Sequence, residues 1–163
     1  MKKVIIIMGS DSDLPTMQGT IKQLRAFGVP FDVRIASAHR SPALAASIAD
    51  GAEADGAGVI IAAAGKAAHL AGVIAAHTIL PVVAVPVKSS TMDGLDSLLS
   101  TVQMPRGIPV ASMAIDGADN AGLFAVQILA LSDAVLAEKY RAYKADMASQ
   151  IEAKDREVSA EYK

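Results

Sequence analysis

The stretch Val4-Ile5-Ile6-Ile7-Met8-Gly9-Ser10-Asp11-Ser12-Asp13 sets the architecture of the chain, because an apolar run ends abruptly in glycine, serine and aspartate. A short apolar run of this kind is typical of a strand that is buried on both faces. Apolar residues then recur at spacings of four and three from Met17 to Phe27, which predicts an amphipathic helix. Asp13 is placed to cap this helix, and Pro15 lies in its first turn. A strand is therefore predicted to lead directly into a helix.

The same alternation of strand and helix continues along the chain. Further strands are predicted at residues 31–36, 58–63, 82–87 and 108–115, and a helix at residues 120–131. Ser41 and Pro42 form a cap and first-turn pair for another helix, with Leu44 and Ile48 on one of its faces. Because strand-helix units of this length join parallel strands by right-handed crossovers, helices should cover both faces of one sheet. We predict an α/β fold, a three-layer flavodoxin-like sandwich with a parallel sheet.

The composition changes after about residue 132, where charged residues become dense and strand signals vanish. A long C-terminal helix is predicted over residues 132–163, with Leu136, Tyr140 and Tyr143 as its apolar side. The helix is either a solvated terminal helix or one that packs on a neighbouring subunit. A chain of 163 residues without a linker suits a single catalytic domain, residues 1–163.

Charge and cysteine content exclude several classes of function. The formal net charge of −2 offers no basic footprint, so we expect neither nucleic acid nor a membrane surface as a partner. The absence of cysteine excludes disulfides, thiolate nucleophiles and cysteine-ligated metals. Three separated histidines without ligand spacing argue against a metal site. No apolar run approaches the ~18 residues of a membrane span, so we expect a soluble, cytoplasmic protein.

Two loops that follow predicted strands carry candidate chemistry. Residues 9–13 offer backbone N–H groups and two serine hydroxyls at a helix start, which suits an anion; a simple capped turn is the alternative. His39 and Arg40 follow the second strand, where imidazole can move a proton and the guanidinium can bind a phosphate or carboxylate. Because neighbouring strand ends face one crevice, these loops should form a single site.

A third loop, residues 62–70, contains Gly65 and Lys66 but lacks the remaining residues of a nucleotide-triphosphate loop. Its alanines and glycine would let a flat ligand approach backbone N–H groups, which can hold a small carboxylate. On its own, His69 fits a structural hydrogen-bonding residue better than a catalyst, and His77 is assigned to structure or surface. Residues 94–107 indicate only a helix followed by a turn.

These motifs resemble those of the class I N5-carboxyaminoimidazole ribonucleotide mutases of purine biosynthesis. The segments that carry the resemblance are MGSDSD, SAHRSP, AGKAAHL, GLDSLLSTVQMPRGIPV and the helix that starts near Asn120, over about residues 3–131. The resemblance implies an isomerase (an intramolecular transferase) that makes 4-carboxy-5-aminoimidazole ribonucleotide on the route to IMP. It also implies no metal or organic cofactor, and a cytoplasmic homo-octamer with sites at subunit junctions.

The resemblance also assigns roles to the candidate residues. His39 would be the general acid/base, with His69 beside it as a second catalytic residue. Ser10 and Ser12 would bind the phosphoribosyl part, Asp13 the ribose and Arg40 the phosphate. The remaining substrate-binding positions would be Gly9, Ser37, Ala38, Ala64, Gly65, Lys66, Ala68 and Leu70.

The implied reaction suits this residue inventory. An N-carboxylate is a labile carbamate, so one histidine and a closed site suffice to release CO2, trap it and return it to C4 of the ring. Lys66, Ala71 and His77 depart from the family pattern, and the Lys66 loop also differs in enzymes that carboxylate 5-aminoimidazole ribonucleotide directly. Residues 67–70 and 103–105 keep the mutase form, which favours the mutase over the direct carboxylase. A receiver-like binding module is disfavoured because no Asp ends the third strand.

Overall fold

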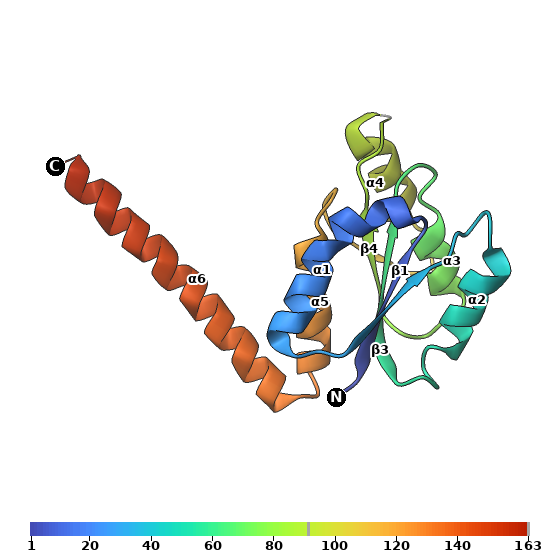
Figure 1. Cartoon of the computed structure of the whole chain (residues 1–163), viewed down its shortest axis with the longest axis horizontal. Coiled ribbons are helices and arrows are strands. Elements are labelled where there is room, and N and C mark those ends of the chain that lie inside the picture. Colours follow the sequence, from blue (N-terminus) through green and yellow to red (C-terminus); the bar gives the residue numbers. More distant parts are fainter. Residues whose placement is uncertain (91, 163) are drawn as a thin grey trace.

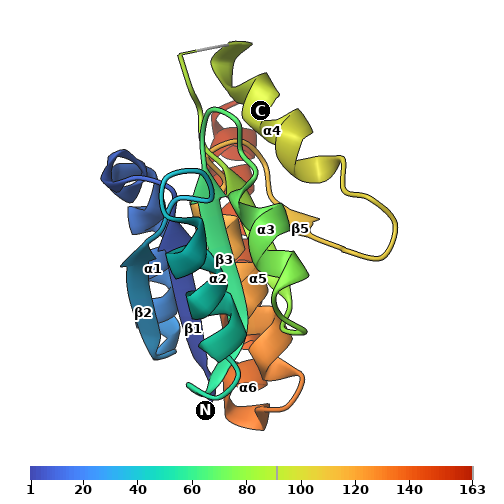
Figure 2. The same cartoon turned by 90° about the vertical axis from the view of Figure 1, so that its right-hand side faces the viewer.

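The computed structural model describes residues 1–90 and 92–162 and contains a five-stranded parallel sheet. The strand order is β2-β1-β3-β4-β5, so β1 lies between the second and third strands of the chain (Figures 1 and 2). The strands are β1 (Lys3–Met8), β2 (Phe31–Ile35), β3 (Ala57–Ala64), β4 (Val82–Pro86) and β5 (Ala111–Ser112). The predicted parallel sheet of a flavodoxin-like sandwich is confirmed.

Helices cover both faces of this sheet. The α-helices are α1 (Leu14–Phe27), α2 (Pro42–Gly51), α3 (Leu70–Ala76), α4 (Leu95–Val102), α5 (Ala118–Ala130) and α6 (Ala134–Glu161), with 3-10 turns η1 (Asp11–Asp13) and η2 (Met92–Gly94). α1 and α5 pack on one face, and α2 and α3 pack on the other (Figure 2). α4 lies at the end of the sheet near β4 and β5.

The core has two halves, separated by the sheet. On β1, Val4, Ile6 and Met8 face the α1–α5 layer, while Ile5 and Ile7 face the α2–α3 layer. All five side chains are at most 3% exposed. Successive side chains of a strand point to opposite faces, so a continuous apolar run is what a sheet covered on both faces requires.

The helix after β2 buries only one of the two apolar residues predicted to share a face. Leu44 is 42% exposed, and α2 contacts the core through Ala45, Ile48 and Ala49. Small residues let this helix lie close to the sheet, and that approach turns the larger Leu44 outward. The apolar side chain predicted at Ile48 is therefore part of the core, whereas that of Leu44 is exposed.

The fifth strand is much shorter than the predicted residues 108–115. Only Ala111 and Ser112 pair with β4, opposite Val83 and Ala84. Pro109 lacks an N–H and cannot join a ladder, and Asp116 takes a positive φ of 56° that turns the chain away. β5 is thus a short edge strand, and a short edge strand is a common way to protect the edge of a sheet from pairing with another chain.

The C-terminal helix begins as an integral part of the domain. Asp133 caps it, accepting a hydrogen bond from the backbone N–H of Leu136 at 3.0 Å. Leu136 is fully buried, and Tyr140 and Tyr143 pack on Phe27 with ring centroids 5.8 and 5.5 Å away. These contacts confirm the predicted apolar side. Beyond them α6 projects away from the sheet (Figure 1). No helix within the described residues is both long and apolar enough to cross a membrane.

Candidate active site

A cleft of about 510 Å³ opens at the carboxyl ends of the central strands. It is bounded by the loops that follow β1, β2, β3 and β4. Within the sheet, β2 is the neighbour of β1 on one side and β3 is its neighbour on the other. The cleft therefore lies where the direction of the strand order reverses. This is the expected ligand position in an open α/β sheet.

The loop after β1 is held by a reciprocal pair of hydrogen bonds. The backbone N–H of Ser10 donates to the Asp13 carboxylate at 3.2 Å, and the Ser10 hydroxyl accepts from the Ser12 N–H at 3.3 Å. This is a capping box of η1. Asp13 precedes α1 as predicted but makes no side-chain cap bond to that helix. The predicted capping of α1 by Asp13 is therefore corrected to capping within η1.

Asp13 is the buried carboxyl group of the cleft, with only 7% of its surface exposed. Burial raises the pKa of this carboxyl above 3.8, and nearby Asp11 adds to the rise, while the hydrogen bond from Ser10 opposes it. A carboxylate placed here can accept hydrogen bonds from sugar hydroxyls, whereas it would repel a phosphate. The role of Asp13 as a ribose partner stays a prediction.

The loop after β2 owes its shape to Ser37. Its hydroxyl accepts hydrogen bonds from the backbone N–H groups of His39, at 3.3 Å, and Arg40, at 3.1 Å. The Ser41 hydroxyl accepts from the Ser37 N–H at 2.9 Å and makes no cap bond to α2, although Ser41 lies at the cap position. Arg40 donates from Nη2 to the Gly9 carbonyl at 3.3 Å, which ties this loop to the loop after β1.

His39 and His69 are in direct contact. Nε2 of His39 lies 2.8 Å from Nδ1 of His69, and the two rings are nearly perpendicular with centroids 4.9 Å apart. One nitrogen must donate and the other accept, so the two rings share a proton. His39 lines the cleft, so this contact offers a path for a proton between the cleft-lining ring and the His69 ring.

The loops bring nearly all predicted site residues together. Every one of them lines the cleft except Ala68 and His69. Ala68 is 2% exposed, and its carbonyl accepts a hydrogen bond from the Thr101 hydroxyl at 3.4 Å, so its side chain belongs to the core. His69 contacts the cleft-lining ring of His39. Ala67 also lines the cleft and has a positive φ of 47°, which marks a tight turn in this loop.

Residues 87–90 form a wall of the cleft that the sequence analysis missed. The Lys88 N–H donates to Asp116 at 2.8 Å, and its ammonium pairs with Asp93 at 3.1 Å. Ser89 donates to Asp96 at 3.1 Å. The available signal was the position of this segment directly after the fourth parallel strand, at the same edge as the other three loops.

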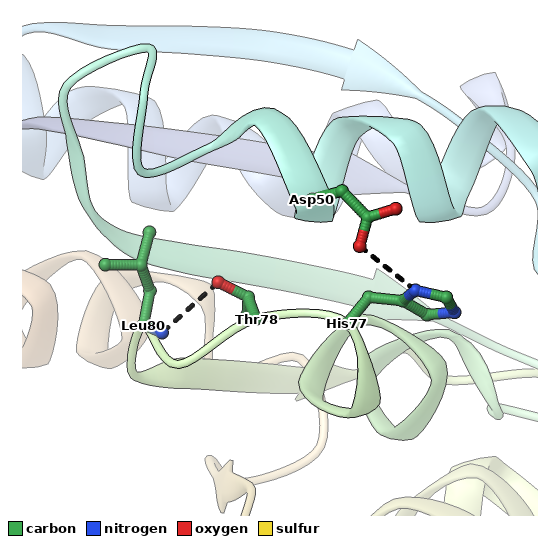
Figure 3. Close-up of polar contacts among 4 residues, drawn as sticks. All are labelled: Asp50, His77, Thr78 and Leu80. Atoms are coloured by element: carbon green, nitrogen blue, oxygen red, sulfur yellow. Dashed lines mark hydrogen bonds and ion pairs between the residues drawn. The ribbon is translucent and has the colours of Figure 1, made fainter.

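His77 lies outside the cleft, as predicted. Its ring nitrogen Nδ1 is 3.2 Å from the Asp50 carboxylate, and the contact joins the ends of α3 and α2 (Figure 3). Beside it, the Thr78 hydroxyl accepts a hydrogen bond from the Leu80 N–H at 3.2 Å. Both partners of the Asp50–His77 pair are well exposed, which confirms the surface assignment. The described residues contain no cluster of His, Asp or Glu side chains able to hold a metal ion.

Comparison with known proteins gives the chain its family. A curated mutase of N5-carboxyaminoimidazole ribonucleotide from Pyrococcus horikoshii is 55% identical over 149 residues, 91% of this chain and 84% of the relative. The mutase of the same name from Methanocaldococcus jannaschii is 49% identical and covers 98% of this chain and 99% of its own. A chloroplastic phosphoribosylaminoimidazole carboxylase from Vigna aconitifolia is 55% identical over 140 residues, but only 25% of that protein is matched.

Solved structures and a family model agree with these relatives. The crystal structure of a single-residue variant of Treponema denticola PurE2 superposes with a TM-score of 0.88 at 30% identity, and covers 96% of this chain and 98% of that one. Treponema denticola PurE superposes with a TM-score of 0.87, also at 30% identity. The family model described as AIR carboxylase matches residues 3–150, nearly the whole folded domain and the first half of α6, and the chain belongs to this family.

Proposed function

We propose that the protein is an N5-carboxyaminoimidazole ribonucleotide mutase, an isomerase of purine biosynthesis. Relatives of that name match this chain over most of their length, at about 50% identity. The observation that carries the proposal is the His39–His69 contact at the edge of a cleft that also presents Arg40. A proton carrier beside an anion-binding loop is what the rearrangement of a phosphorylated, carboxylated imidazole requires.

The substrate is placed by charge and shape. We assign the phosphate to Arg40 and to the loop of Ser10 and Ser12, and the ribose to Asp13. One N–H of the Arg40 guanidinium donates to the Gly9 carbonyl, and its other N–H groups can donate to a phosphate. Ser37 and Ala38 then border the ring, while Ala64, Gly65 and Leu70, with the Ala68 backbone, form the wall around the carboxyl group.

The reaction needs only proton transfer and confinement. The N5–carboxyl bond breaks, its electron pair stays on N5, and His39 protonates that nitrogen as CO2 departs. C4 of the aminoimidazole then attacks the trapped CO2, and His39 takes the C4 proton to restore aromaticity. The proton given to N5 is thus recovered from C4, so the net change is an isomerisation. The His69 ring can accept a hydrogen bond from the charged His39 ring, and the contact can persist when His39 is neutral.

Direct carboxylation of 5-aminoimidazole ribonucleotide is the second candidate, favoured by the carboxylase name of the Vigna aconitifolia relative. Three quarters of that protein lies outside the match, and its name describes the whole protein. The mutase relatives are matched nearly end to end. The mutase is therefore the better-supported function.

An isotope experiment separates the two. N5-carboxyaminoimidazole ribonucleotide carrying a ¹³C carboxyl group is incubated with the enzyme in excess unlabelled bicarbonate. A mutase retains most of the label at C4, because the CO2 never leaves the site. Product that carries no label, together with equally fast product formation from 5-aminoimidazole ribonucleotide and bicarbonate, would establish the carboxylase instead.

We further propose a homo-oligomer, an octamer by family resemblance, in which α6 lies on a neighbouring subunit. Support comes from the outer part of α6, where Met147, Ile151, Val158 and Tyr162 are 40–79% exposed. A phosphorylated nucleotide does not cross membranes unaided, so we propose that the enzyme works in the cytoplasm. We also propose that it uses no metal or organic cofactor, because the reaction needs only proton transfer and confinement.

A further inference from the structure

The cleft is lined by three cationic side chains, which differ in the hydrogen bonds and ion pairs that they already make. Arg40 is hydrogen-bonded to the Gly9 carbonyl, and Lys88 is paired with Asp93. Lys66 lines the same cleft and is exposed, and it has no ion pair or hydrogen bond with any other residue that the structure describes. Of the two lysine ammonium groups in the cleft, that of Lys66 is therefore available to a ligand without breaking an existing contact.

Lys66 is fixed on the same side of the cleft as the histidine pair. It lies on the loop between β3 and α3, three positions before His69. The loop is tight, because Ala67 has a φ of 47° and the His69 N–H donates to the Ala67 carbonyl at 2.7 Å. The arrangement ties the position of the Lys66 backbone to that of His69.

The substrate of the proposed reaction has two anionic groups, a phosphate and a carboxylate. Arg40 belongs with the phosphate, because it is bonded to the loop that presents Ser10 and Ser12. The carboxylate is attached to the atoms that gain and lose the proton, so it must lie near His39. The lining of that side is otherwise supplied by Ala64, Gly65 and Ala67, which offer no charge.

We propose that the Lys66 ammonium binds the carboxylate of the substrate before the rearrangement and that of the product after it. This inference rests on the proposed mutase function and adds a role that is selective for the carboxylated ligands. CO2 carries no charge, so the contact is stronger in both bound end states than in the intermediate. Lys66 therefore acts in binding the two end states, and its loss should raise KM without lowering kcat.

The test compares ligands that differ only in the carboxylate. Dissociation constants of 4-carboxy-5-aminoimidazole ribonucleotide and 5-aminoimidazole ribonucleotide are measured by calorimetry on the full-length enzyme. For Lys66→Gln we expect the carboxylated ligand to bind about tenfold more weakly and the uncarboxylated one to change less than about twofold, which is the loss of one charge-assisted contact. Lys66→Arg should restore most of the difference.

Lys88→Gln is the matched control, because it removes an ammonium from the same cleft and should weaken the two ligands equally. An equal effect of Lys66→Gln on both ligands, or a carboxylate-selective loss in Lys88→Gln alone, would overturn the assignment. If the wild-type enzyme binds neither ribonucleotide, the proposed function itself fails. That result is distinct, because it precedes any comparison of variants.

Discussion

In the proposed mechanism, the His39 imidazole carries the proton. Nε2 faces His69, and the cleft lies beside the ring. For His39→Asn we expect a kcat at least ~100-fold lower, the usual contribution of a general acid/base. The dissociation constant of the ribonucleotide should change less than about tenfold, since Arg40 and the loop of Ser10 and Ser12 remain. Steady-state kinetics and calorimetry measure both quantities.

His77→Asn is the control for this substitution. His77 pairs with Asp50 on the surface away from the cleft, so the same chemical change there should leave kcat unchanged (Figure 3). If His39→Asn keeps near-normal turnover while a folded His69→Asn loses it, the general acid/base is His69 and the mechanism must be rewritten.

Asp13 links the site to stability. Because burial raises the pKa of its carboxyl, the folded state holds this proton more tightly than the unfolded chain does. Between 3.8 and the raised pKa, stability therefore falls as pH rises, and above it the cost of a buried charge is fully present. Asp13→Asn removes this charge and keeps an acceptor for Ser10.

We therefore expect Asp13→Asn to raise Tm at pH 7, and the gain to vanish as pH falls to about 4, near the ordinary pKa of an aspartate. Melting curves across this range measure the effect. Asp155→Asn, an equal charge change on the exposed surface of α6, is the control and should show no such trend. A Tm gain for Asp13→Asn that is independent of pH would contradict the argument.

Which residues meet in the site was only partly predictable from their spacing. His39 and His69 are 30 positions apart, and they meet because the loops after β2 and β3 converge over the end of β1. The sequence predicted the shared edge, since parallel strands end together. The pairing of two ring nitrogens depends on side-chain geometry, which a sequence pattern does not contain.

At the scale of elements, three glycines differ in what an added side chain would meet: a strained backbone, a steric conflict, or neither. Gly94 precedes α4 with a φ of 92°, and a Cβ there would lie 2.9 Å from Ile115 Cγ2 and 3.0 Å from Lys88 Cα. Gly56 has a φ of 79° but open space around it, and Gly51 has neither restriction. Comparing the three therefore isolates backbone strain from steric conflict.

We expect Gly94→Ala to lower the free energy of unfolding by about 2–4 kcal/mol, because strain and overpacking add. Gly56→Ala should cost about 1 kcal/mol from strain alone. Gly51→Ala, at the end of α2, should be neutral or gain up to about 1 kcal/mol. Urea titrations measure all three. Equal losses for Gly94→Ala and Gly56→Ala would show that the neighbours of Gly94 yield freely.

Element types were more predictable than element limits. The long apolar runs of β1 and β3 are buried on both faces, so their strands followed from hydrophobicity alone. β5 did not, because pairing ends where Pro109 and the turn at Asp116 interrupt the ladder. The exposure of Leu44 was not predicted, because alanines, which carry little hydrophobic signal, form most of the contact face of α2 beside Ile48.

At the scale of the whole molecule, α6 divides into two parts. Its first turns hold Leu136, Tyr140 and Tyr143 against the domain. Its outer part extends away from the sheet (Figure 1). Exposed Met147, Ile151 and Val158 lie on this part, and exposed Tyr162 caps its C-terminal end. At 100° per residue these four fall within one narrow stripe. An apolar stripe on a projecting helix is costly to leave in water, which supports packing on another subunit.

We predict that Ile151→Asp with Val158→Asp weakens the oligomer, because two buried carboxylates would face an apolar surface. Sedimentation velocity should show smaller species, while the helical circular dichroism stays within about 10% because Leu136, Tyr140 and Tyr143 still anchor α6. Ala153→Asp with Ala160→Asp adds the same charge at the same spacing on the opposite face of α6 and should leave sedimentation unchanged. If both double variants sediment as the wild type does, α6 is a solvated terminal helix, and the subunits must meet through another surface.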